Sequence, residues 1–288
     1  MQIVTDSGTD ISLSKEEQQD LNIHVVPLNV SLDNVTYREG VDIQPAEFYP
    51  MLAKTEDMPT TSQPSAGEFA DTYRKILEYD QDILSIHISS GLSGTYNSAL
   101  AAAQMLPDAN ITVIDAKTLS AAAGWQVEAA ARAVKKGLEI DEVKSLVERI
   151  SAASDSIYTL NEMKYLIHGG RISHMKGLLA SILNIKPMIG VEKVGGTYVQ
   201  LGQVRTFKRA VQGLVNIISE QYPPGSALRV QVLHSFNFEG ASMLKEQIDK
   251  TFDCTWLPDG HISLVLGAHT GPSMIGAAYA LQEVFADL

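Results

Sequence analysis

Short apolar runs alternate with longer stretches of helical periodicity through the first half of the chain. Apolar, β-branched runs predict strands, and apolar residues spaced three to four positions apart predict helices. The predicted strands are residues 3–5, 24–30, 83–88 and 111–114. One predicted helix begins at Ser14 and another ends near residue 105. The other predicted helices cover residues 45–52, 66–79, 120–136 and 140–153. Because strands alternate with helices, we expect βαβ units and a parallel sheet covered on both faces.

The pattern changes near residues 154–156. Gly195-Gly196 lies between two apolar runs and predicts an antiparallel hairpin, which does not belong in a doubly wound parallel sheet. The other predicted elements are strands at 157–160, 228–233 and 262–266 and helices at 208–221, at 239–250 and from 273 onward. We therefore expect an α/β fold with two domains. Residues 1–155 would form a three-layer α/β/α domain with a parallel sheet, and residues 156–288 an α+β domain with a mixed sheet.

Composition narrows the class of protein. The formal net charge of −12 argues against nucleic-acid binding, which needs a basic face. A single cysteine, Cys254, allows no internal disulfide. The N-terminus lacks the basic and apolar regions of a signal peptide, and no apolar run approaches the ~20 residues that span a bilayer. We expect a cytoplasmic protein whose only membrane association is transient surface contact.

Residues 89–96, SSGLSGTY, form a loop of glycine and hydroxyl residues between a predicted strand and a predicted helix. Backbone N–H groups at a helix start and nearby hydroxyls suit a small anion. The loop lacks the Gly-Lys-Ser/Thr of a phosphate-binding loop, and Thr95 replaces the last glycine of a nucleophile elbow. An N-capped turn without a ligand is the structural alternative.

Three other stretches offer similar donors: residues 60–65, 169–173 and 269–273. Together the four loops predict one anionic head group held mainly by neutral hydroxyls and amides. A hydrolase built from Ser93 and His269 would lack both the elbow and an identifiable acid. Asp6, Ser7 and Asp10 match no ligand spacing for a metal, so we expect neither a metal nor a cofactor.

At these residues the sequence resembles the DegV family of bacterial fatty-acid-binding proteins, some of which are carriers for a fatty acid kinase. The resemblance covers nearly the whole chain. It departs from the family pattern at Ser273, where a glycine is usual. The motifs that carry it are Val4-Thr5-Asp6-Ser7, Val41-Asp42-Ile43, Thr61-Ser62-Gln63-Pro64-Ser65, Ser89 to Tyr96, Thr118-Leu119-Ser120-Ala121, Gly169-Gly170-Arg171-Ile172-Ser173, Ile185-Lys186-Pro187 and His269-Thr270-Gly271-Pro272.

The resemblance implies one long-chain acyl ligand in a tunnel between two α/β domains. It implies that Thr61, Ser93 and the amide of Gly94 bind the carboxylate, and that Arg171, His269 and Thr270 lie in the head-group region. The apolar stretch 175–188 is a candidate wall for the tunnel, with ordinary core as the alternative. Its candidate residues are Leu178, Leu179, Ile182, Ile185 and Met188.

A carrier of this kind binds and does not catalyse. It presents the carboxylate to a separate ATP-dependent fatty acid kinase, which makes the acyl phosphate. Arg205, Lys208 and Arg209 cluster in an acidic protein and form a candidate docking patch for the kinase, or simply a solvated helix start. Two alternatives stay open. One is a subunit related to dihydroxyacetone kinase that acts on a small hydroxylated or phosphorylated metabolite; the other is an interaction protein with an empty cleft.

Overall fold

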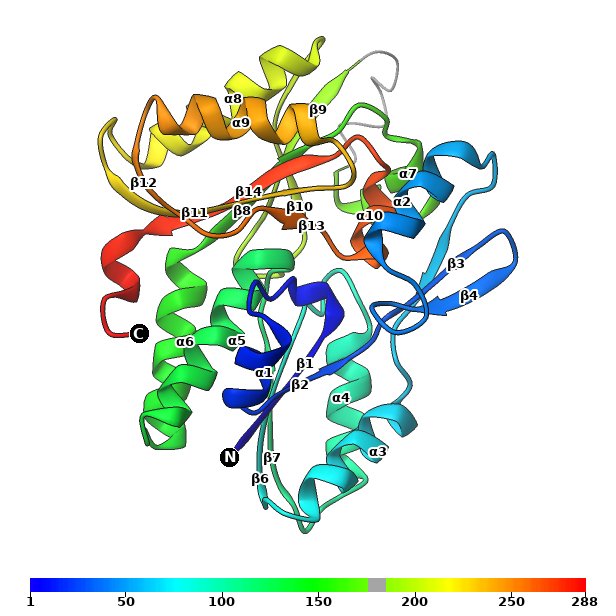
Figure 1. The fold of residues 1–288 in the computed structure, drawn as a ribbon, viewed down its shortest axis with the longest axis vertical. Helices are drawn as coiled ribbons and strands as arrows, with labels where there is room; N and C mark the ends of the chain where they lie inside the picture. The colour runs from blue at the N-terminus through cyan, green and yellow to red at the C-terminus, as the bar shows by residue number, and fades with distance from the viewer. Residues whose placement is uncertain (176–184) are drawn as a thin grey trace.

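A four-stranded parallel sheet organises the first half of the chain in the computed structural model, which describes residues 1–175 and 185–288 (Figure 1). The strand order is β2-β1-β6-β7, and each neighbouring pair is parallel. Parallel neighbours need crossover connections, which here are mostly helices. The strands are β1 (Gln2–Asp6), β2 (Ile23–Val26), β6 (Asp82–His87) and β7 (Asn110–Asp115).

Helices cover both faces of this sheet. On one face, α3 and α4 pack Phe69, Tyr73 and Ala99 against strand residues such as Val4. On the other, α5 and α6 pack against a core that includes Ile3. The first-half helices are α1 (Lys15–Asp20), α3 (Ala66–Leu77), α4 (Thr95–Gln104), α5 (Ser120–Lys135) and α6 (Ile140–Ala153). The three-layer α/β/α arrangement is therefore confirmed.

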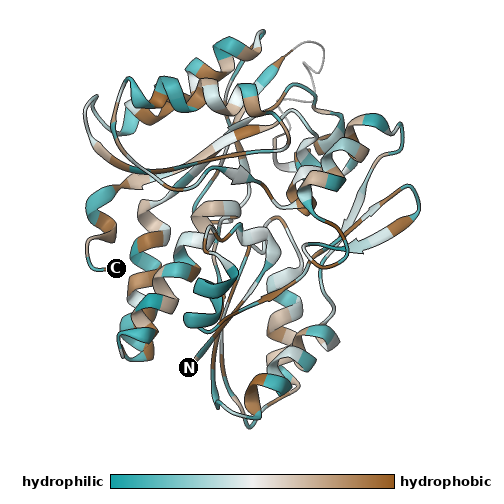
Figure 2. Cartoon of the chain, in the orientation of Figure 1, coloured by the Kyte–Doolittle hydropathy of each residue, from teal (hydrophilic) through white to brown (hydrophobic). Residues whose placement is uncertain are grey.

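A mixed sheet organises the second half. Its order is β10-β9-β8-β14-β11-β12, with β13 beside β11. β11 pairs parallel with β12 and antiparallel with β14. Helices α8 and α9 cover one face through a second core, and both show alternating hydrophobic and polar positions in Figure 2. These elements are β8 (Asp155–Thr159), β9 (Lys186–Val191), β10 (Tyr198–Val204), α8 (Phe207–Gln221), β11 (Ala227–His234), α9 (Phe238–Asp249), β12 (Asp253–Trp256), β13 (Gly260–His261) and β14 (Ile275–Leu281).

A small antiparallel sheet and three short helices lie beside both large sheets. The small sheet has the order β4-β3-β5, and α10 packs against α2 and α7 (Figure 1). The two-domain α/β fold is thus confirmed, and the boundary between residues 155 and 156 stays a prediction. The elements are β3 (Asn29–Leu32), β4 (Val35–Arg38), α2 (Pro45–Lys54), β5 (Thr60–Ser62), α7 (Lys164–His168) and α10 (Leu264–Thr270).

Two predicted elements near the C-terminal end were wrong. Residues 264–270, expected to end a strand and enter a loop, form helix α10. Residues 275–281, expected in a helix, form strand β14. Alanine-rich segments favour helices, but β14 is enclosed between β8 and β11, where small residues fit. A Cβ on Gly276 would lie 2.6 Å from the carbonyl oxygen of Ile157.

Other differences are smaller. The predicted strand 24–30 is divided at Pro27 into β2 and β3, which belong to different sheets, because proline cannot donate to a ladder. The exposed strand β4 and the short strands β5 and β12 were not predicted. The hairpin around Gly195-Gly196 is confirmed, with β9 and β10 as its antiparallel strands.

Candidate functional site

A small polar cavity lies where the two halves of the chain meet. Its volume is about 30 Å³, roughly the share of one water molecule in the liquid. Four residues singled out in the sequence contribute to its wall, from four separate segments. The polar residues of the wall are Thr61, Ser62, Gln63, Ser93, Arg171, Tyr198 and His269.

Thr61 and His269 form a direct contact across the cavity wall. Thr61 lies on β5 and His269 on α10, and Thr61 Oγ1 lies 2.8 Å from His269 Nε2. The imidazole also lies against the backbone of Gly169, where a Cβ would come within 2.0 Å of Nδ1. The glycine of the Gly169-Gly170-Arg171 motif therefore makes room for the ring.

His269 is a neutral imidazole in this fold. Burial, together with the charges of Arg171 and His168, lowers its pKa to about 3. Its Nδ1 has no hydrogen-bond partner among the described residues. A buried donor without a partner costs more than a weakly used acceptor. The favoured tautomer therefore carries its proton on Nε2 and donates it to Thr61 Oγ1.

Ser93 and Gly94 lie at the start of α4, in the loop that follows β6. Ser93 Oγ lies 2.8 Å from Thr95 Oγ1 and accepts from the Thr95 amide at 3.3 Å. Gly94 is the residue before the first helical turn, and a Cβ there would lie 2.8 Å from Gln63 Nε2. The loop thus brings the Ser93 hydroxyl to the cavity wall, whereas Gly94 lies behind Gln63 and does not itself line the cavity.

Arg171 supplies the positive charge of the site. Its Nη1 donates to the carbonyl oxygen of Gly169 at 2.6 Å, and its Nε donates to that of Leu92 at 3.4 Å. No salt bridge joins it to an acidic residue in the part of the chain that the structure describes. Carbonyl oxygens orient the guanidinium without neutralising it, so its charge remains for an anion.

The 89–96 loop also touches the β9–β10 hairpin through glycines on both sides. A Cβ on Gly91 would lie 2.3 Å from the carbonyl oxygen of Gly195, and one on Gly196 would lie 2.0 Å from Ser89 Oγ. Gly196 has φ +66°, which glycine adopts readily. These glycines permit a backbone contact between the halves, a role that the motif alone did not reveal.

A second cavity, mainly apolar, adjoins the polar one. It also has a volume of about 30 Å³, and the two share Leu119, Tyr198 and Leu266. Thr270, expected near the head group, lines this apolar cavity instead. Its hydroxyl donates to the carbonyl oxygen of Leu266 within α10 at 3.0 Å. The shared residues place a polar compartment directly beside an apolar one.

The residues expected to line the tunnel have different positions. Leu178, Leu179 and Ile182 lie outside the described residues. Ile185 packs at the edge of the main core. Met188 lines neither of these two cavities, and its role in a tunnel stays a prediction. It belongs to the core under α8, where a Cβ on Gly213 would lie 2.1 Å from its sulfur. Side chains alternate along β9, so Met188 faces away from its neighbour Ile189 in the main core.

The candidate docking residues Arg205, Lys208 and Arg209 are all exposed, at and just before the start of α8. None forms a salt bridge with a described acidic residue. They lie on the mixed-sheet half, whose helices α8 and α9 face away from the parallel sheet (Figure 1). The three charges are therefore free for a partner, although the structure does not bring them to the cavities.

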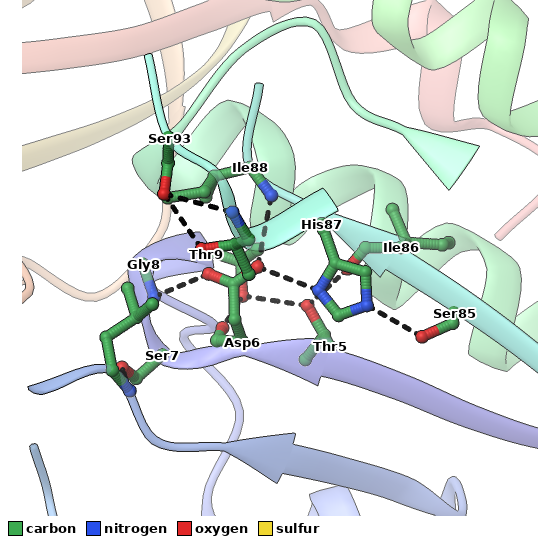
Figure 3. Close-up of polar contacts among 12 residues, drawn as sticks. Thr5, Asp6, Ser7, Gly8, Thr9, Ser85, Ile86, His87, Ile88 and Ser93 are labelled. Carbon is green, nitrogen blue, oxygen red and sulfur yellow. Dashed lines mark hydrogen bonds and ion pairs between the residues drawn. The ribbon is translucent and has the colours of Figure 1, made fainter. Parts of the chain in front are cut away.

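A Ser–His–Asp arrangement that the sequence did not predict lies in the first half (Figure 3). Ser85 Oγ is 2.7 Å from His87 Nε2, and His87 Nδ1 is 2.9 Å from Asp6 Oδ2. All three side chains are fully buried, and the Tyr73 hydroxyl also contacts Ser85. No substrate reaches the serine, so this is not a hydrolytic triad. Asp6 instead accepts from the amide of Ile88, which fixes the strand end before the 89–96 loop.

Two kinds of feature, a metal cluster and a membrane-spanning helix, bear on what the site can bind. Across residues 1–175 and 185–288, no cluster of three His, Cys, Asp or Glu side chains has the geometry to hold a metal ion. Within the same ranges, no helix is both long and apolar enough to cross a membrane.

Comparisons with known proteins agree with this architecture. The family model described as "Uncharacterised protein, DegV family" matches residues 1–282. A DegV domain-containing protein of Staphylococcus aureus strain N315 is 35% identical over 274 residues, which cover 95% of this chain and 96% of that protein. The chain belongs to the DegV family, as the sequence motifs predicted.

Two solved structures are similar over almost their full lengths. The first, described as showing fatty acid binding of a DegV family protein from Thermus thermophilus, is 29% identical with a TM-score of 0.87 and covers 97% of this chain and 99% of its own. The second, a stearic-acid-binding protein from Eubacterium ventriosum, is 28% identical with a TM-score of 0.80 and covers 98% of this chain and 99% of its own.

Proposed function

We propose that this protein binds one long-chain fatty acid between its two halves, with the carboxylate in the polar cavity and the acyl chain in the apolar one. The observation that carries the proposal is that the two cavities are adjacent and share Leu119, Tyr198 and Leu266 in their walls. A fatty acid has the same division into one anionic end and one apolar tail. The relatives from T. thermophilus and E. ventriosum, described as binding fatty acids, support the same ligand class.

The polar cavity offers a carboxylate a defined set of donors. Because His269 Nε2–H donates to Thr61, the Thr61 hydroxyl hydrogen is free to point at the ligand. Ser93 can turn its hydroxyl from Thr95, and the Gly94 amide and the Arg171 guanidinium complete the set. Hydrogen bonds to a charged acceptor are stronger than neutral ones. Hydroxyls and amides supply these hydrogen bonds to the carboxylate at a lower desolvation cost than a fully buried ion pair.

Ligand entry requires the cavity walls to move. Each cavity has the volume of about one water molecule, so an acyl chain fits only when the lining residues separate. The polar residues of the wall come from five segments on both halves, and a small shift between the halves would widen both cavities together. We therefore expect the ligand-bound form to be more open along the seam between α10 and the 89–96 loop.

Presentation to a kinase is the second part of the proposal. The protein would hold the carboxylate for a separate ATP-dependent fatty acid kinase and would not itself catalyse. Arg205, Lys208 and Arg209 would dock the kinase through their free charges. Arg205→Glu should lower acyl-phosphate formation at limiting protein concentration while fatty acid affinity stays unchanged. Lys250→Glu, an exposed charge at the end of α9, is the matched control. Unchanged turnover in Arg205→Glu would remove the docking assignment.

Mass spectrometry of an organic extract of the purified protein tests the ligand itself. A fatty acid of about 14 to 18 carbons at one equivalent per chain would support the proposal and identify the preferred acyl group. A folded protein without extractable lipid that also fails to bind added oleate would contradict it. That result would favour a small hydroxylated or phosphorylated metabolite, the ligand class of the dihydroxyacetone kinase alternative.

A further inference from the structure

A third cavity, open to solvent and of about 320 Å³, also lies at the junction of the halves. It shares no lining residue with the polar cavity. Its wall comes from the loop after β1, the start of α1, the segment 39–45, strand β11 and the segment 258–263. Its volume lies at the lower end of the range for small-molecule sites.

One buried and one partly buried carboxylate, those of Glu39 and Asp10, lie in the wall of this cavity. Glu39 is 9% exposed and accepts hydrogen bonds from Ser7 Oγ at 2.7 Å, from Ser263 Oγ at 2.8 Å and from the Leu264 amide. Asp10 accepts from Ser120 Oγ at 2.5 Å and from the Ser263 amide at 2.7 Å. Both carboxylates are therefore held in fixed positions by neutral donors.

Neither carboxylate has a positive partner. Among the described residues no Lys, Arg or His forms a salt bridge with Asp10 or Glu39, whereas Asp6 pairs with His87. Burial and the nearby negative charges raise the pKa of Glu39 to about 7 and that of Asp10 well above its usual range. Buried charges are costly unless they are paired. Without a positive partner the protonated, neutral forms of the two carboxyl groups are favoured, and a bound cation would favour their ionised forms instead.

An independent feature of the same wall is an amide donor without a partner. Gln231, on β11, is 2% exposed and lines the cavity. Its Oε1 accepts from Trp125 Nε1 at 3.1 Å. Because the indole nitrogen is only a donor, this contact fixes which end of the amide is oxygen. Its Nε2 donates to no atom of the described residues, so it is available to an acceptor on a ligand in the cavity.

From these features we infer that the third cavity binds a small organic amine that also carries a hydroxyl or carbonyl oxygen, as an amino alcohol does. The ammonium group faces Asp10 and Glu39, and the oxygen accepts from Gln231 Nε2. The site shares no lining residue with the polar cavity proposed for the carboxylate, and its wall meets that of the apolar cavity at Leu233 and Ile262. The inference does not depend on the fatty-acid proposal.

Titration calorimetry with matched pairs of probes tests the inference on the wild-type protein. Serinol and glycerol differ only by an amine in place of one hydroxyl, and ethanolamine and ethylene glycol differ in the same way. We expect each amine to bind at least about tenfold more tightly than its neutral counterpart, the usual effect of a charged hydrogen-bond partner. Equal affinities within each pair, or no binding by either amine, would overturn the inference.

Asp10→Asn removes a carboxyl group that can ionise beside a bound ammonium, while keeping the shape of the side chain. It should weaken serinol binding by about tenfold, and Asp141→Asn, an exposed acid on α6, should leave it unchanged. Equal affinity in wild type and Asp10→Asn would contradict the site.

If Asp10→Asn does not fold, the pH dependence of the wild type decides. The charged groups that face the carboxylates are Asp6 with His87, Lys15, Asp259 and His261, with Tyr49 behind Glu39. Burial lowers the pKa of His261, which favours its neutral imidazole. An amine favours ionised Glu39, so serinol affinity should rise about tenfold between pH 6 and 8 with proton release. A flat profile, or a fall in affinity with rising pH, would contradict the assignment.

Discussion

At the scale of single residues, the hydroxyls of Thr61 and Ser93 are held differently. Thr61 lies on a strand and contacts His269 from the other half of the chain. Ser93 lies in a loop and contacts only its near neighbour Thr95. Thr61 therefore depends on how the two halves meet, whereas Ser93 is set locally by the turn before α4.

Replacing either hydroxyl tests carboxylate recognition. Thr61→Ala and Ser93→Ala each remove a hydrogen bond to a charged group, worth about 1.5–3 kcal/mol, so fatty acid affinity should fall by roughly 10- to 100-fold. Thr60→Ala, an exposed neighbour on the same strand, is the control. Affinity can be measured by displacement of a fluorescent fatty acid. A double variant with wild-type affinity would place the head group elsewhere.

His269 should make stability depend on pH. The fold lowers its pKa from 6.5 to about 3, mainly through burial. Between these values the unfolded chain binds one more proton than the folded chain, so falling pH favours unfolding by about 1.4 kcal/mol per pH unit. From pH 7 to pH 5, wild type should lose about 2 kcal/mol more than His269→Gln.

Urea denaturation at both pH values measures that difference, with the exposed His168→Gln as control. Glu39 acts in the opposite direction, since its raised pKa costs stability as pH rises toward 7. It is present in every variant, so it cancels in the comparison. Equal losses in wild type and His269→Gln would show that the imidazole is not desolvated.

The sequence predicted part of the residue-scale picture. Hydroxyl-rich loops beside helix starts indicated Thr61 and Ser93, and the family motif added Arg171 and His269. Tyr198 was missed, because its position in the cavity depends on how the hairpin meets the other half. The motif had also suggested the head-group region for Thr270, whose hydroxyl bonds within α10.

At the scale of elements, a helix and a strand near the C-terminal end were each predicted as the other type. A local sequence pattern was therefore not sufficient to predict secondary structure there. β14 has small side chains because it is enclosed on both sides by antiparallel partners. Taken without their neighbours, its small residues predict a helix. Their burial between two strands depends on tertiary contacts, which a local pattern does not contain. The longer helices α6 and α8 were predicted well, because their own periodicity and capping define them, and α5 was predicted from its run of alanine-rich sequence.

Replacing Gly276 tests how tightly β14 is packed between β8 and β11. In Gly276→Ala, the new Cβ would lie 2.6 Å from the Ile157 carbonyl oxygen and 2.8 Å from Tyr158 Cβ. Overpacking of this kind costs about 1–3 kcal/mol in the free energy of unfolding. Gly260→Ala on β13 meets its nearest neighbour, a Leu233 methyl, at 3.7 Å and should change stability far less. Equal urea midpoints for the two variants would mean that β14 is loosely packed.

At the scale of the whole molecule, the two halves are joined by a charged and aromatic contact. Arg229 on β11 pairs with Glu128 on α5 at 2.8 Å and is 12% exposed. Its guanidinium lies 5.3 Å from the Trp125 ring centre and 4.5 Å from that of Phe285. No sequence motif indicates this contact, because its two charged residues lie 101 positions apart in the chain.

Removing Arg229 should weaken this contact between the two halves. Arg229→Ala leaves Glu128 half-compensated by Arg132 and opens space beside Trp125, so we expect a loss of about 3 kcal/mol. Arg132→Ala removes the more exposed partner of the same carboxylate and should cost less than about 1 kcal/mol. Urea denaturation can be monitored by the fluorescence of Trp125 in a Trp256→Phe background. Trp125 lies beside Arg229, so its signal reports on the contact between the halves. Equal destabilisation by both variants would contradict the assigned role of Arg229.

The position of β14 has a consequence for how the protein is made. Ribosomes release the chain from its N-terminal end, and all four strands of the parallel sheet precede residue 116. β14 lies between β8 and β11 yet emerges after both, so until then the mixed sheet exists only as two unjoined pieces. The first half can therefore fold during synthesis, whereas the second must wait. A ribosome-bound nascent chain that stops before β14 should resist protease in its first half only.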